Sequence, residues 1–205
     1  MAASSDIAFT PAVKAVQTAR GSRALYARVE ERGGFQTRIT EDLVAFLASV
    51  DTAYLATANL DGQPYAQHRG GPKGFIRVVD DTTLGFDDFT GNRQYISAGN
   101  LMENDKAFLF LMDYAHRRRV KVWGRARMTD DEALIEQLMP TDYRARPEQA
   151  MLFTVEAWDM NCPQHIPQKI DMVDVTTAIG RFEARIAALE AENATLRQQI
   201  ERNRP

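Results

Sequence analysis

The sequence is poor in the side chains that form disulfides and metal centres. It contains one cysteine and three histidines in 205 residues. A single thiol excludes a disulfide framework and any zinc site built from several thiolates. The histidines show no metal-binding spacing such as HExxH. We therefore expect neither a disulfide-stapled fold nor a metal site.

Long apolar runs and a strong net charge are also missing. The longest apolar stretch, residues 107–112, is six residues long, whereas a membrane-spanning helix needs about 20. Residues 1–14 have neither the basic start nor the apolar core of a secretory signal. A net charge of −3, from 25 Lys and Arg against 28 Asp and Glu, argues against a dedicated nucleic-acid binder. We expect a soluble cytoplasmic protein that binds no membrane.

The first 50 residues have the spacing of short helices. Thr10 before Pro11 is typical of a helix start. Ser22 is placed to cap a second helix, which ends at the Gly33-Gly34 pair, and Thr40 is placed to cap a third. The third helix carries an apolar stripe of Leu43, Val44, Phe46, Leu47 and Val50.

From Asp51 onwards the pattern changes to that of strands. Strands are predicted over residues 53–59, 64–69, 75–79, 82–86, 107–112, 119–128 and 151–158, with helices over 93–103 and 130–138. Asp61-Gly62 is a typical hairpin turn. Because most connections are tight turns, the pattern indicates a mainly β, α+β fold with an antiparallel barrel rather than a parallel doubly wound sheet.

The last 30 residues follow a heptad pattern. Ile179, Ile186, Asn193 and Ile200 occupy position a, and Phe182, Leu189 and Leu196 occupy position d. Isoleucine at a with leucine at d favours two parallel strands, and a single Asn at a fixes register. This predicts a coiled coil between two chains, while a helix packed on its own domain is the alternative.

Three cationic stretches are candidates for binding a phosphate. Residues 69–74 (Arg-Gly-Gly-Pro-Lys-Gly) predict a tight loop with exposed amides between Arg69 and Lys73. Residues 90–94 open a predicted helix, whose N-terminus would attract anions near Arg93. Residues 117–127 hold six cations in 11 residues around Trp123. The alternatives are a plain hairpin turn, a capped helix start and a solvated strand face; nucleic-acid binding is a further alternative for the third stretch.

Few other side chains suggest catalysis. His165 is a candidate general acid or base, with a simple loop residue as the alternative. Cys162 lies beside Pro163 with no clear base partner, so an inert thiol is the favoured interpretation. Asp87 and Asp88 are paired carboxylates, which more often accept hydrogen bonds in a turn.

Taken in order, these stretches resemble the pyridoxamine 5′-phosphate oxidase-like flavoproteins, the FMN-binding split β-barrel family. The resemblance covers residues 40–158. It depends on the Tyr-Leu-Ala-Thr strand, the Asp-Gly-Gln-Pro-Tyr turn, Arg69 to Lys73, the stretch from Phe86 to Arg93, and the Arg-Val-Lys-Val-Trp-Gly-Arg-Ala strand from Arg119.

The resemblance implies a six-stranded antiparallel barrel and a homodimer with FMN at its interface. Together with the helical and heptad patterns, it leads us to expect a helical extension (1–39), the barrel (40–172) and the coiled-coil helix (173–205). The residues that it implies for FMN are Arg69, Gly70, Gly71, Pro72, Lys73, Asp87, Asp88, Asn92, Arg93, Gln94, Arg119 and Trp158.

The departures from the family pattern concern the substrate. Gln94 stands where the family has a phosphate-binding Lys, and Arg119 where it commonly has Gln. After Trp158 the oxidases carry an Arg-x-His segment that holds pyridoxal, and residues 159–168 lack it. We therefore expect an FMN-dependent oxidoreductase of a sister group, with His165 as proton donor. The alternative is a non-catalytic flavin or haem module whose coiled coil engages a partner.

Overall fold

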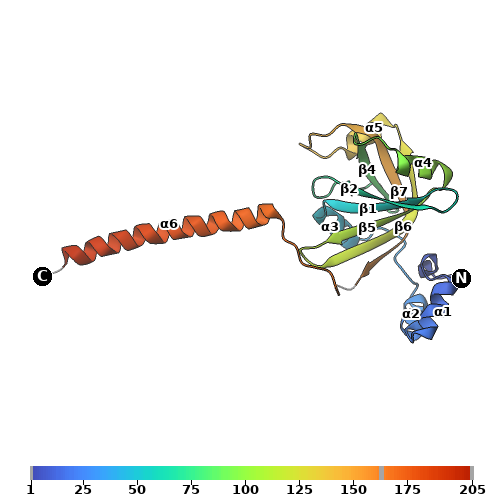
Figure 1. The fold of residues 1–205 in the computed structure, drawn as a ribbon, viewed down its shortest axis with the longest axis horizontal. Coiled ribbons are helices and arrows are strands. Elements are labelled where there is room, and N and C mark those ends of the chain that lie inside the picture. Colours follow the sequence, from blue (N-terminus) through green and yellow to red (C-terminus); the bar gives the residue numbers. More distant parts are fainter. Residues whose placement is uncertain (1, 162–163, 204–205) are drawn as a thin grey trace. The chain divides into compact units, whose positions relative to one another are not determined.

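A computed structural model describes residues 2–161 and 164–203 (Figure 1). The strands are β1 (Thr52–Ala58), β2 (Pro64–Gly70), β3 (Arg77–Val78), β4 (Thr83–Phe89), β5 (Lys106–Asp113), β6 (Arg118–Thr129) and β7 (Pro147–Asn161). The helices are η1 (Ser4–Ile7), α1 (Pro11–Ala19), α2 (Arg23–Glu31), α3 (Glu41–Ser49), α4 (Ile96–Glu103), α5 (Glu132–Leu138) and α6 (Met172–Arg202).

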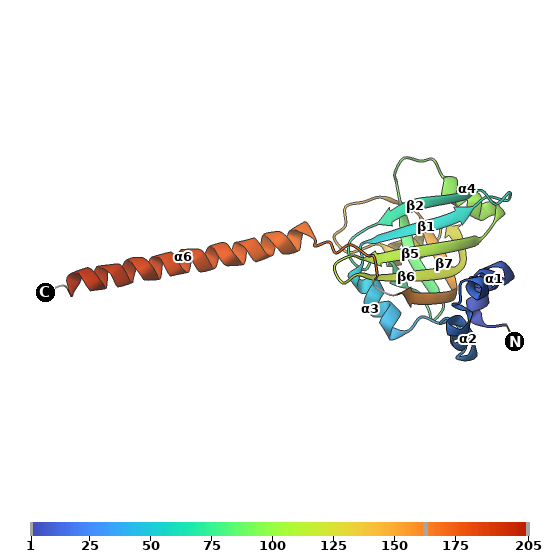
Figure 2. The same cartoon turned by 60° about the horizontal axis from the view of Figure 1, so that its bottom comes forward.

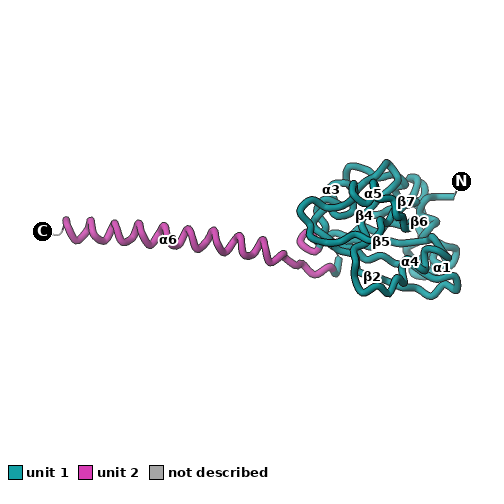
Figure 3. Tube along the Cα trace, turned by 90° about the horizontal axis from the view of Figure 1, so that it is seen from above, with its two compact units in different colours: residues 1–113, 117–165 teal, residues 114–116, 166–205 magenta. Residues whose placement is uncertain are grey.

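Two compact units make up the chain, shown in different colours in Figure 3. The first contains residues 1–113 and 117–165, and therefore every strand together with helices η1 to α5. The second contains residues 114–116 and 166–205, and therefore α6. Cysteine 162 lies outside the described residues.

All seven described strands form one antiparallel sheet in the order β2-β1-β5-β6-β7-β4-β3. β2, β1, β5 and β6 are seen side by side in Figure 2. The antiparallel α+β prediction is confirmed. The expected closed barrel of six strands is not seen, because β2 and β3 are the two edges of an open sheet.

One face of the sheet builds the core together with α3. Alternating side chains of β5 and β6, such as Leu109 and Val122, are fully buried. Helix α3 adds Leu43 and Phe46 to the same cluster. Val44 belongs to the predicted stripe but is 45% exposed, so the apolar face of α3 is narrower than expected.

Several predicted elements have different bounds. β3 contains two residues rather than five. Phe75 and Ile76 follow a turn, in which the Phe75 amide donates to the Pro72 carbonyl, and their side chains are buried in the core. β4 continues to Phe89 because it stays paired with β7. α4 begins at Ile96 rather than 93, since Arg93 and Tyr95 adopt left-handed φ angles of 56° and 52°.

Helix capping follows the sequence only in part. The side chain of Thr10 accepts a hydrogen bond from the Val13 amide, as predicted. Ser22 and Thr40 precede α2 and α3 but make no side-chain capping bond, so those predictions are wrong. The Ser22 hydroxyl instead donates to the carbonyl of Gln17.

Residues before α3 are anchored to the outer side of the sheet. The ring of Phe35 stacks on Trp123 of β6, with centroids 5.2 Å apart. Gln36 exchanges backbone hydrogen bonds with Trp158 of β7. The N-terminal segment is therefore an integral part of the first unit.

Helix α6 is 31 residues long, and every side chain described in it is exposed. Its apolar residues therefore have no cover within the second unit. Among the described residues, no helix is both long and apolar enough to cross a membrane.

Glycine 124 lies at the register shift between β6 and β7, where a methyl group has no room. A Cβ there would lie 2.0 Å from the carbonyl oxygen of Thr154. We predict that Gly124→Ala lowers the free energy of unfolding by about 1–3 kcal/mol, measured by urea denaturation. In α4, Gly99 has open space around its Cβ position, so Gly99→Ala should stabilise by up to about 1 kcal/mol. Equal midpoints for the two variants would contradict this geometry.

Candidate anion-binding cleft

A cleft of about 250 Å³ opens where β2, β4, the loop after β4 and the start of α4 meet. Its lining residues are Tyr65, Gln67, Arg69, Asp88, Phe89, Gly91, Asn92, Arg93, Gln94, Tyr95, Ile96, Ser97, Ala98 and Glu148. Two of the three cationic stretches singled out in the sequence therefore contribute to one cleft.

The floor of the cleft contains an ion pair between Arg69 of β2 and Asp88 of β4. Their side chains are only 11% and 17% exposed. β2 and β4 are not neighbours in the sheet, so the pair connects strands that share no backbone hydrogen bonds. One Arg69 guanidinium nitrogen contacts Asp88, whereas its Nε is buried and has no hydrogen-bond partner in the part of the chain that the structure describes.

The rim contains a second pair, between Arg93 and Glu148 of β7. The Arg93 Nη2 and Nε atoms donate to Glu148 Oε1 at 3.0 and 3.3 Å, and the Tyr95 hydroxyl donates to Oε2 at 3.2 Å. Donation from Arg93 lowers the pKa of Glu148 below its ordinary value. Arg93 itself is 64% exposed, so its guanidinium can exchange partners at low cost.

Neutral polar groups complete the wall. The buried Ser97 donates its hydroxyl to Gln67 Oε1 at 2.8 Å, linking α4 to β2. The backbone amide of Gln94 donates to the side-chain Oδ1 of Asn92 at 3.3 Å. The helix-start argument for residues 90–94 is wrong, because α4 begins beyond them.

Charge in the cleft is balanced. Two guanidinium groups face two carboxylates, Asp88 and Glu148, so the lining carries no excess of positive charge. An anion entering here would compete with those carboxylates for the same N–H donors. A phosphate group is suited to this exchange because it accepts several charge-assisted hydrogen bonds at once.

The loop after β2 lies outside the cleft lining. The amide of Gly71 donates to the Asp51 carbonyl at 3.1 Å, and that of Gly74 to the Val50 carbonyl at 3.0 Å. The expectation of exposed amides is wrong for these two glycines, since both amides hold the loop against the start of β1. Lys73 is exposed, and Gly70, Gly71, Pro72 and Lys73 are not among the lining residues.

Asp87 and Asp88 lie on opposite faces of β4, because successive strand residues alternate. Only Asp88 lines the cleft. Asp87 is 5% exposed, and neither of its carboxylate oxygens has a hydrogen-bond partner among the described residues. Burial raises the pKa of Asp87 to about 6, and the charge of Arg77 partly opposes that shift.

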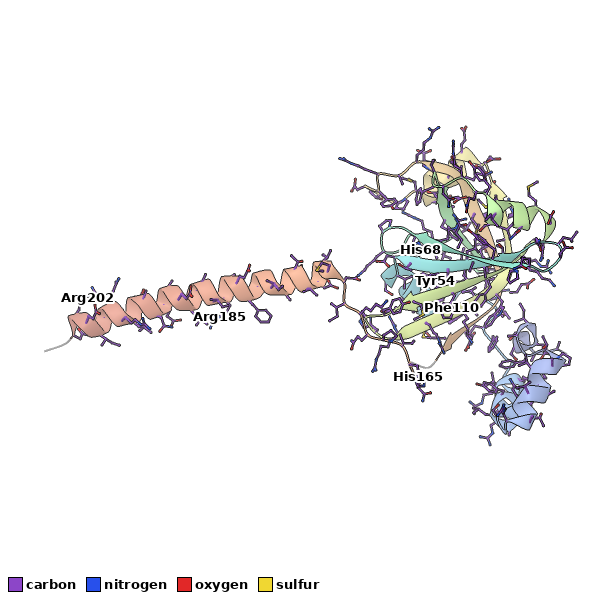
Figure 4. The ribbon with its side chains drawn as sticks, in the orientation of Figure 1. Tyr54, His68, Phe110, His165, Arg185 and Arg202 are labelled. Atoms are coloured by element: carbon purple, nitrogen blue, oxygen red, sulfur yellow. The ribbon has the colours of Figure 1, made fainter. Side chains whose placement is uncertain are left out.

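Three further predicted site residues lie elsewhere. Trp158 is 5% exposed, and its indole Nε1 donates to the Arg38 carbonyl at 2.8 Å. Arg119 is half-buried on β6, with a buried Nε that has no partner. His165 is exposed in a left-handed conformation, and Figure 4 shows where it lies. None of the three lines the cleft.

Several residues that line the cleft were not predicted from the sequence. Tyr65 and Gln67 share a face of β2 with Arg69, so strand alternation is the sequence signal that could have identified them. His68 lies on the opposite face, where its ring packs edge-on against the ring of Tyr54, with centroids 5.8 Å apart. Both residues are labelled in Figure 4. Glu148 gave no local signal, because only the pairing of β4 with β7 brings it to the cleft.

A sequence model of the family described as pyridoxamine 5′-phosphate oxidase matches residues 39–162. Among solved structures, HupZ of Group A Streptococcus is 19% identical over 64% of this chain and 99% of that one, with a TM-score of 0.47. General stress protein 26 of Bacillus anthracis is 15% identical over 58% and 91%, with a TM-score of 0.46. An FMN-binding protein from Syntrophomonas wolfei is 11% identical over 71% and 97%, with a TM-score of 0.47. No curated protein sequence matches the chain.

The buried carboxyl of Asp87 predicts a pH dependence of stability. Its pKa rises from 3.8 to about 6 on folding, so the folded state binds more protons and loses stability as pH rises from about 4 to 7. Relative to Asp87→Asn, the wild type should lose on the order of 2 kcal/mol across that range in urea denaturation.

Asp80 provides a control of opposite sign. A hydrogen bond from the Thr82 amide lowers the pKa of Asp80, so the wild type should gain stability relative to Asp80→Asn as pH rises. A pH-independent difference between wild type and Asp87→Asn would contradict the burial of an unpartnered carboxylate.

Proposed function

Because the chain belongs to the pyridoxamine 5′-phosphate oxidase family, we propose that it binds FMN and acts as an FMN-dependent oxidoreductase. The observation that carries this proposal is that Arg69 and Arg93 both line one cleft. The buried Nε of Arg69 lacks a partner, which is the type of donor that a bound phosphate would satisfy.

The cleft fits the phosphate end of FMN. Its volume of about 250 Å³ is slightly below the ~300–1,000 Å³ of typical small-molecule pockets, so it would not enclose a whole flavin. Arg69 would bind the phosphate from the floor and Arg93 from the rim. Ser97 and Gln67 would hold the polar wall of the same cleft. Bound FMN would supply the redox chemistry.

A cleft that holds only part of the cofactor needs a second wall. We propose that a second copy of the chain supplies it, in a homodimer with FMN at the interface, as the family resemblance implies. We also propose that six of the seven strands correspond to the split β-barrel that the family resemblance implies, and that the protein is cytoplasmic. Gly70, Gly71, Pro72, Lys73, Asp87, Asn92, Gln94, Arg119, Trp158 and His165 remain predictions for the wider site.

The substrate is expected to differ from pyridoxamine phosphate, because residues 159–168 lack the Arg-x-His segment of the oxidases. Turnover with NADH or NADPH and a dye acceptor tests the enzymatic part of the proposal. Flavin binding without turnover would identify a carrier or sensor instead. A protein that takes up no FMN on titration would overturn the flavin proposal altogether.

The two arginines should contribute to FMN affinity through the phosphate. We predict that Arg69→Ala and Arg93→Ala each weaken FMN binding by about 1.5–3 kcal/mol, roughly 10- to 100-fold in Kd, by fluorescence titration. Riboflavin lacks the phosphate, so its Kd should not change in Arg93→Ala, whose side chain is exposed, and in Arg69→Ala its Kd should rise less than that of FMN. Arg125→Ala is the matched control, since Arg125 is paired with Asp105 and Glu156 outside the cleft. Equal losses for FMN and riboflavin would contradict the assignment.

Glu148 should oppose the phosphate. Removing its charge in Glu148→Gln frees Arg93 and lowers the negative charge of the rim. We predict tighter FMN binding by about 0.2–1 kcal/mol, up to roughly fivefold in Kd, with no change for riboflavin. Weaker FMN binding in this variant would show that Glu148 positions Arg93 rather than competing for it.

A further inference from the structure

Helix α6 carries a continuous apolar seam that its own unit leaves exposed. The helix begins at Met172, so the heptad pattern extends one repeat earlier than the sequence analysis placed it. Met172 falls at position a and Val175 at position d. The apolar a and d residues are between 36% and 77% exposed: Met172, Val175, Ile179, Phe182, Ile186, Leu189, Leu196 and Ile200.

The seam is narrow. Apart from Val173, every large apolar residue of α6 lies at an a or d position. Positions b, c and f hold mainly alanine and polar residues, such as Ala184, Ala191 and Gln198 at f. A helix packed on a globular core normally has a wider apolar face, whereas a strict a/d stripe is typical of a coiled-coil seam.

We propose that α6 pairs in parallel and in register with α6 of a second copy of this chain, from Met172 to Ile200. Isoleucine at a with leucine at d favours two strands. Asn193 then faces Asn193 of the second copy, where two side-chain amides can hydrogen-bond with each other. This inference depends on α6 alone and not on the proposed flavin function.

Charge complementarity supports the parallel arrangement. In a parallel pair each g residue lies near the e residue five positions later on the other helix. Arg185 thus meets Glu190 of the second copy, and Glu192 meets Arg197 of the second copy. Both contacts are attractive, and each occurs twice in a symmetric dimer.

An antiparallel pair is less favourable. It stacks a residues against d residues, so Asn193 would lie opposite an apolar side chain and its amide would be buried without a polar partner. That arrangement also places e residues opposite e residues, so the attractive contacts between g and e residues, Arg185 with Glu190 and Glu192 with Arg197, are lost.

Disulfide crosslinking of the full chain tests the pairing. In a Cys162→Ser background, cysteines are introduced singly at d positions near either end of the seam, as Val175→Cys and Leu196→Cys. Ala184→Cys at an f position is the matched control. The proteins are oxidised at micromolar concentration and resolved on non-reducing gels. Circular dichroism of the reduced proteins checks that each variant retains its helix.

In a parallel, in-register pair, Cα atoms at matching d positions lie within disulfide reach, about 4.4–6.8 Å. Both d variants should therefore crosslink at least tenfold faster than the control. Adding Ile186→Asp to Leu196→Cys should abolish its crosslink.

Three outcomes would overturn the proposal. Crosslinks that form only when the d-position variant Val175→Cys is mixed with an a-position variant at the other end, Ile200→Cys, would indicate an antiparallel pair. Rates equal to the Ala184→Cys control would show that α6 is unpaired in the purified protein. A mass of three or more copies in light scattering would exclude a two-stranded coil. FMN titration of the same samples is independent, so a failure of the flavin proposal would be seen separately.

Discussion

The ion pair between Arg69 and Asp88 joins two strands that the backbone hydrogen bonds of the sheet leave apart. β2 is one edge of the seven-stranded order, and β4 lies at the far end beside the short β3. The sheet must curve until the two side chains meet, and the cleft forms at that meeting point. Because both groups are largely buried, loss of either partner would leave an uncompensated charge.

The same pair determines what the cleft can bind. Each guanidinium is already matched by a carboxylate, so the chain folds without concentrated positive charge at this point. An anionic ligand would bind by replacing carboxylate contacts and by using the orphaned Nε of Arg69. Selectivity would then come from how many N–H donors one ligand can engage at once, which favours phosphate over smaller or singly charged groups.

The first unit and α6 differ in how they cover their apolar residues. The first unit buries its apolar residues within one chain, around Leu109, Val122 and the side chains of α3. α6 keeps its apolar seam exposed over 31 residues, which is stable only if another surface covers it. The proposed cofactor site and the proposed pairing of α6 both require a second copy of the chain.

Four features could be predicted from the sequence alone: the strand alternation, the antiparallel fold class, the heptad seam and the family. These are local or ordered patterns, readable because side chains repeat every two or every 3.5 residues. It also selected Arg69 and Arg93 for one ligand. Three features became visible only in the folded chain: Glu148 faces Arg93, the Asp87 carboxylate is buried without a partner among the described residues, and the Gly71 amide already donates to the Asp51 carbonyl. Those outcomes depend on contacts between residues distant in the chain, and no local spacing encodes which strands will be brought together.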